Sequence, residues 1–78
     1  MNIDTILEKM LEKYKSRPVT TIDGIKIHFD NEWVHLRKSN TEPVVRIYAE
    51  SDLMAKAENL ARKIMNDLKE ILNGNVIE

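Results

Sequence analysis

The sequence contains no cysteine, so neither a disulfide nor a thiolate-bound metal can stabilise the fold. It also lacks an excess of charge: the formal net charge is -1, which argues against the bulk nucleic-acid affinity that clustered positive charge provides. No apolar run approaches the ~20 residues that cross a bilayer. The N-terminus has no basic start followed by an apolar core, so no secretory signal is visible. We therefore expect a cytoplasmic protein that binds neither nucleic acid nor a membrane.

The length of 78 residues suffices for one domain, which we place over 1–78. Apolar residues at helical spacing predict a first helix over about 3–15, which Arg17-Pro18 ends. Alternating apolar and polar residues then predict strands over about 19–22, 25–30, 33–37 and 44–49. Asp23-Gly24 indicates a tight turn. A second apolar stripe predicts a helix over about 52–73, with Ser51 or Asp52 as its cap.

This order of elements predicts an α+β fold. Short turns make the sheet mainly antiparallel, and both helices must cover its single apolar face, which gives a two-layer sandwich. The opposite face of the sheet would then carry polar and aromatic side chains, namely those of Lys26, His28, Trp33, His35, Arg37, Arg46 and Tyr48. Aromatic and arginine side chains on an uncovered face suggest contact with another molecule.

The stretch RKSNTEP at 37–43 connects the predicted strands over about 33–37 and 44–49. Arg37 closes one strand and Arg46 lies early in the next, both on the face away from the helices. Between them, Ser39, Asn40 and Thr41 offer hydroxyls, an amide and backbone N–H groups. Successive N–H donors form an anion-binding concavity, and arginine matches phosphate oxygens bidentately. The same residue types also form ordinary hairpin loops, and a carboxylate within the stretch favours that alternative.

Residues 37–46, RKSNTEPVVR, resemble the phosphate-binding loop of the α-D-phosphohexomutases, which include phosphomannomutases, phosphoglucomutases and phosphoglucosamine mutases. The upstream DGIKIHFDNEWVHLR and the downstream IYAES before a long helix resemble the same C-terminal, fourth domain of that family. The resemblance implies a TATA-box-binding-protein-like fold. It also implies that Arg37 makes the main charge contact to the substrate phosphate, with Ser39, Asn40 and Thr41 as further donors. Arg46 would be a second cation whose reach depends on the shape of the loop.

The resemblance further implies a function as part of a larger enzyme. Such mutases interconvert hexose 1- and 6-phosphates, using a phosphoserine loop and a magnesium loop from other domains. No Asp-x-Asp pattern exists here, so we expect this chain to need no cofactor and to catalyse nothing alone. The resemblance implies that it binds a hexose phosphate. Magnesium is expected in the full-length enzyme, the other domains are the expected partners, and the isolated domain should be a monomer. Asn40, where the family has Gly or Asn, favours the mannomutase and glucomutase branch.

Other interpretations remain open. The chain could instead be a free-standing module that binds phosphate or a phosphosugar. His28 and His35 lie on the same predicted sheet face and could hold a metal, although no nearby acid or cysteine completes the set. The last helix could contact a partner helix. A single nucleic-acid strand could stack on the exposed sheet face, through Trp33, Arg37, Arg46 and Tyr48.

Overall fold

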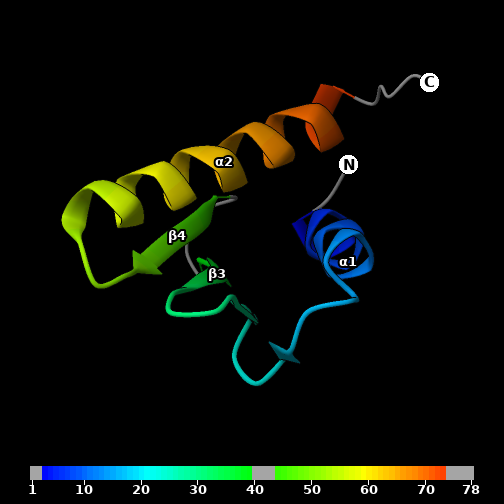
Figure 1. The fold of residues 1–78 in the computed structure, drawn as a ribbon. Helices are drawn as coiled ribbons and strands as arrows, with labels where there is room; N and C mark the ends of the chain where they lie inside the picture. The colour runs from blue at the N-terminus through cyan, green and yellow to red at the C-terminus, as the bar shows by residue number, and fades with distance from the viewer. Residues whose placement is uncertain (1–2, 40–43, 74–78) are drawn as a thin grey trace.

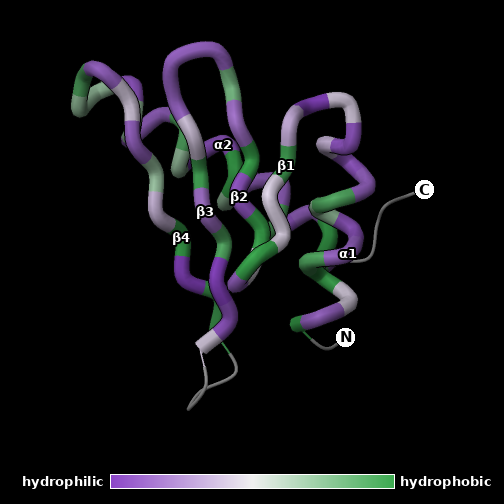
Figure 2. Tube along the Cα trace, turned by 90° about the horizontal axis from the view of Figure 1, so that it is seen from below, coloured by the Kyte–Doolittle hydropathy of each residue, from purple (hydrophilic) through white to green (hydrophobic). Residues whose placement is uncertain are grey.

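The computed structural model describes residues 3–39 and 44–73. Two helices, α1 (Ile3–Lys13) and α2 (Met54–Asn73), flank the strands β1 (Val19–Thr20), β2 (Ile25–His28), β3 (Trp33–Lys38) and β4 (Val45–Glu50). Each strand pairs antiparallel with the next, in the sheet order β1-β2-β3-β4 (Figure 2). Neither described helix has the length and apolar character that a membrane crossing requires.

The core lies between the sheet and the two helices (Figure 1). Residues alternate in burial along β2 and β3, because successive side chains of a strand point to opposite faces. The buried side chains from both layers are those of Ile6, Met10, Tyr14, Ile25, Ile27, Val34, Leu36, Leu60, Ile64 and Leu68. Full burial of one such side chain contributes roughly 1.5–3 kcal/mol. This arrangement confirms the predicted α+β two-layer fold.

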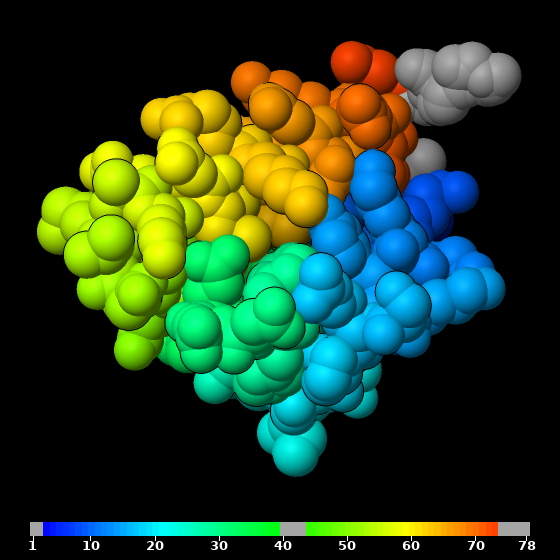
Figure 3. Space-filling model, viewed as in Figure 1, coloured from blue at the N-terminus to red at the C-terminus, as the bar shows by residue number. Residues whose placement is uncertain are grey.

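A polar contact joins α1 to α2 within this otherwise apolar core. Asp67 is buried in the apolar stripe of α2 and accepts a hydrogen bond from the hydroxyl of Tyr14. The ammonium of Lys13 lies 3.1 Å from the other carboxylate oxygen of Asp67. Figure 3 shows the resulting junction, where the blue surface of α1 adjoins the orange half of α2. A buried carboxylate is tolerated only when it is paired in this way.

The junction changes the ionisation of both partners of Asp67. Burial, together with the hydrogen bond to Asp67, raises the pKa of the Tyr14 hydroxyl above its ordinary value. The hydrogen bond to the same carboxylate raises the pKa of Lys13. The sequence pattern did not single out Asp67, although its position between Ile64 and Leu68 on the apolar stripe was a signal that it would be buried.

The first helix and the first strand are shorter than predicted. After Lys13 the backbone tightens: the N–H of Lys15 donates to Glu12 O at 3.4 Å, and the N–H of Arg17 donates to Tyr14 O at 2.9 Å. These bonds span three residues instead of four, which ends an α-helix ahead of the following proline. β1 ends at Thr20 because the connection to β2 takes in 21–24, a longer turn than the predicted Asp23-Gly24 pair.

The other boundaries shift by one or two residues. β2 ends at His28 because the N–H of Phe29 donates to Glu32 O at 2.8 Å and closes a turn. β3 runs one residue further than predicted, and β4 both begins and ends one residue later than predicted. Helix α2 begins at Met54, and the carbonyl of Leu53 accepts the hydrogen bond from Ala57 N. Leu53 thus takes the N-cap position that we predicted for Ser51 or Asp52.

Candidate functional site

The loop between β3 and β4 is closed at its base by a backbone hydrogen bond. The N–H of Ser39 donates to Val44 O at 3.1 Å, which continues the hairpin beyond the last strand pair. The N–H of Ser39 is therefore already engaged within the hairpin. Two predicted site residues, Asn40 and Thr41, lie outside the described residues.

Arg37 and Arg46 face each other directly across β3 and β4. Both are exposed and belong to the sheet face opposite the helices. Directly opposed residues of an antiparallel pair have Cβ atoms about 4.5–5.5 Å apart, and like charges in this arrangement destabilise a sheet. An anion bound between the two guanidinium groups would relieve this repulsion. The structure thus brings the two predicted cations together at one end of the sheet, beside the loop.

A third residue, Asp23, reaches this end of the sheet from the connection between β1 and β2. Its carboxylate Oδ2 lies 3.0 Å from an Nη of Arg37. Its backbone carbonyl oxygen lies 2.8 Å from Nε2 of His35, two residues before Arg37 on the same strand face. Sequence reasoning identified Asp23 only as a turn residue, because nothing in the local pattern indicates which strand the turn approaches.

The turn itself has an unusual backbone. Asp23 has a φ angle of 57° and Gly24 one of 100°, so both lie in the region that non-glycine residues rarely adopt, although Asp and Asn tolerate it best. A Cβ at position 24 would stand 2.4 Å from the carbonyl oxygen of Leu36 and 3.4 Å from Cα of Arg37. The absence of a side chain at Gly24 therefore lets the turn lie directly against β3 at Arg37.

The remaining outer face of the sheet carries aromatic contacts. The ammonium of Lys26 lies 4.2 Å from the centre of the Trp33 ring, a cation–π geometry. The rings of His35 and Tyr48 have centroids 6.4 Å apart. His28 lies opposite Trp33, and His35 lies opposite Lys26, so the two histidines are not directly opposed. No cluster of three or more His, Cys, Asp or Glu side chains suited to a metal occurs among the described residues.

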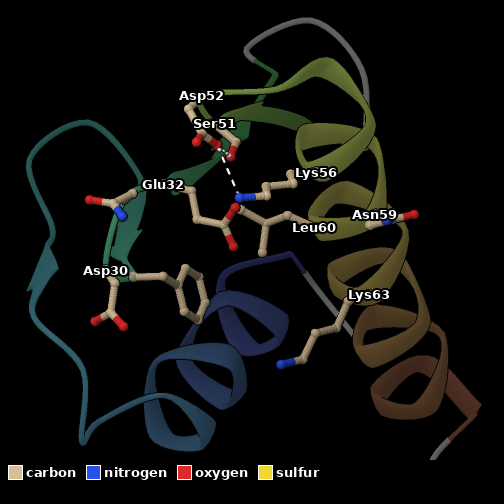
Figure 4. A pocket seen from close by; sticks show the side chains of 10 residues that line it. Asp30, Glu32, Ser51, Asp52, Lys56, Asn59, Leu60 and Lys63 are labelled. Atoms are coloured by element: carbon tan, nitrogen blue, oxygen red, sulfur yellow. Dashed lines mark hydrogen bonds and ion pairs between the residues drawn. The ribbon is translucent and has the colours of Figure 1, made fainter.

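A hollow of about 440 Å³ lies at the other end of the sheet, between the β2–β3 turn and the first turns of α2 (Figure 4). Its lining residues are Phe29, Asp30, Asn31, Glu32, Ser51, Asp52, Lys56, Asn59, Leu60 and Lys63. The ammonium of Lys56 lies 3.5 Å from the carboxylate of Asp52. Three carboxylates and two ammonium groups leave no net positive charge to attract a phosphate. The candidate anion site is therefore the pair of arginines and not this hollow.

The comparisons with known proteins concern almost the whole chain. Residues 2–67 match the family model described as phosphoglucomutase/phosphomannomutase, C-terminal domain. A phosphoglucosamine/phosphogalactosamine mutase of Sulfurisphaera tokodaii is 45% identical over 74 residues, which cover 92% of this chain and 15% of that protein.

Two further relatives are named for other sugars than the first. A phosphoglucomutase/phosphomannomutase of Thermococcus kodakarensis is 39% identical over 82% of this chain and 14% of its own length. A phosphomannomutase of Methanocaldococcus jannaschii is 45% identical over 60% of this chain and 10% of its own length. The chain thus spans about one seventh or less of these relatives.

Proposed function

This chain belongs to the family of phosphoglucomutase/phosphomannomutase C-terminal domains, as its residues 37–46 predicted, and we propose that it binds the phosphate group of a hexose phosphate. The observation that carries the proposal is the direct opposition of Arg37 and Arg46 beside the loop that begins at Ser39. Guanidinium groups carried by two directly opposed residues offer forked donors to the oxygens of a phosphate dianion.

The proposed role in catalysis is to hold the substrate. A whole mutase of this kind would interconvert hexose 1- and 6-phosphates. In it, this domain would bind the phosphate that does not react and so orient the sugar. The phosphoserine and the magnesium of that reaction would belong to other domains. The hydroxyl of Ser39, together with Asn40 and Thr41, would supplement the arginines, as the family resemblance implies.

The proposal names a class of substrate and not one sugar. Asn40 led us to expect the mannomutase and glucomutase branch, but the similar proteins favour neither branch, because they include mutases named for glucosamine and galactosamine and others named for glucose and mannose. The arginines match phosphate oxygens, and the sugar-selecting loop of such a mutase would belong to another domain. Recognition by this chain should therefore depend on the phosphate and scarcely on the sugar.

A nuclear magnetic resonance titration tests the proposal. Inorganic phosphate and glucose 6-phosphate should both shift the amide signals of Arg37, Ser39 and Arg46, whereas free glucose should shift none. Because the site is open to water and charge-assisted hydrogen bonds are partly screened there, we expect a Kd on the order of 1 mM, or about 4 kcal/mol of binding free energy.

Arg37→Ala should abolish these shifts without unfolding the chain, because the side chain lies on the face away from the core. The matched control is Arg62→Ala, which removes the same charge from an exposed position of α2. The control should bind phosphate as the unaltered chain does. Shifts centred on Phe29–Glu32 and Lys56–Lys63 would instead assign the site to the hollow and refute the proposal.

A further inference from the structure

Three separate contacts hold the turn at Asp23 and Gly24 against β3 beside Arg37. The Asp23 carboxylate lies 3.0 Å from the Arg37 guanidinium. The Asp23 carbonyl oxygen lies 2.8 Å from the ring nitrogen of His35. The bare Cα of Gly24 permits the close approach to the backbone of Leu36 and Arg37. An ion pair, a hydrogen bond and a steric fit thus converge on one segment of β3.

Stability alone gives little reason for this ion pair. The side chains of Arg37 and Asp23 are 45% and 67% exposed, and exposed pairs contribute little to folding because water and salt screen them. The turn also places Asp23 in a backbone conformation that is unfavourable for a residue with a side chain. What the contact does achieve is to restrict a long, flexible side chain at the centre of the candidate site.

We propose that Asp23 is a positioning residue for Arg37: it holds the guanidinium in the orientation that receives the substrate phosphate. This inference rests on the proposed function. A guanidinium has five N–H donors, so an edge bound to the Asp23 carboxylate leaves other donors for phosphate oxygens. A side chain that is already ordered loses less rotamer freedom when the ligand binds, and the affinity rises accordingly.

The test replaces the carboxylate and keeps the turn. Asp23→Asn retains a residue that tolerates a positive φ and removes the charge that holds Arg37. Asp30→Asn is the matched control, because it makes the same charge change at an exposed position at the opposite end of the sheet. The probe is inorganic phosphate, titrated into each 78-residue chain while the amide signals and the Arg37 Nε–Hε signal are recorded.

We expect Asp23→Asn to weaken phosphate binding about 3–10-fold, the loss that one additional immobilised side chain causes. The Nε–Hε signal of Arg37 should also move toward the position of a freely rotating arginine in the absence of phosphate. Asp30→Asn should leave both readouts unchanged. A role confined to the stability of the turn would alter the melting temperature but not this side-chain signal in the folded protein.

Two results would overturn the inference. If Asp23 merely competes with phosphate for Arg37, removal of its charge will tighten binding, and if Asp23 plays no part, the affinity will not change. Failure of the proposed function itself has a different signature, since the unaltered chain would then show no response to phosphate at Arg37 or Arg46.

Discussion

Replacing Tyr14 by Phe should remove one hydrogen bond from the junction between α1 and α2 and leave the packing intact. The ring of Tyr14 stands edge-on to that of Phe29, with centroids 5.9 Å apart, and a phenylalanine ring can keep this contact. The lost group is the hydroxyl that donates to the buried carboxylate of Asp67. Lys13 would then be the remaining described partner of that carboxylate.

The magnitude follows from the charge of the acceptor. A hydrogen bond to a charged group contributes about 1.5–3 kcal/mol to folding, roughly twice the value for a neutral pair. A chain of this length has a total stability of roughly 4–12 kcal/mol, so the loss is a large part of it. In a domain of this size, 1 kcal/mol corresponds to about 4–8 °C, so the Tm should fall by at least about 6 °C.

Thermal unfolding at pH 7, followed by circular dichroism, measures this effect. The control is Tyr48→Phe, which removes a hydroxyl from the exposed face of the sheet and should change stability by less than about 0.5 kcal/mol. If Tyr14→Phe also stays within that margin, the hydrogen bond to Asp67 does not stabilise the fold and the account of the junction is wrong.

Two further predictions concern pH and the turn beside the candidate site. Because the pKa of Tyr14 is raised in the folded state, its contribution is complete below the ordinary value of 10.0 and is lost as the pH rises through the folded value. The Tm should therefore fall more steeply above pH 10 than it does in Tyr14→Phe, and equal slopes would contradict this. Gly24→Ala should cost about 2–4 kcal/mol, because a Cβ would lie 2.4 Å from Leu36 O at a φ of 100°. Thr21→Ala in the same exposed turn should be nearly neutral in urea unfolding, and equal losses for the two variants would refute the steric argument.

The sequence predicted the faces of the elements better than their ends. Alternation assigned Ile27 and Leu36 to the core and Arg37 to the outer face. Successive side chains of a strand point to opposite faces, so burial of one face fixes the side on which every residue lies. The ends depend on backbone hydrogen bonds such as that from Phe29 to Glu32, which local composition does not specify.

The described part of the candidate site contains three residues that the sequence singled out, Arg37, Ser39 and Arg46, and one that it did not, Asp23. Arg37 and Arg46 follow from the strand pattern and the family motif, and the pairing of β3 with β4 sets them opposite each other. Asp23 is distant in sequence from Arg37, and its contact depends on how the turn folds back over β3. The hydrogen bond between Tyr14 and Asp67 could not be predicted from local sequence either, since it joins residues 53 positions apart.

That separation has a consequence for the order in which the native contacts form. Each strand pairs with the next, so a sheet contact such as Ile27 with Val34 closes a short loop. The hydrogen bond between Tyr14 and Asp67 instead closes a loop of 53 residues. Loop entropy rises by about 0.6 kcal/mol for each doubling of length, so the helix junction costs about 2 kcal/mol more than the hairpin. Chain entropy therefore opposes the helix junction more than it opposes the pairing of neighbouring strands, and the junction should form after the hairpins.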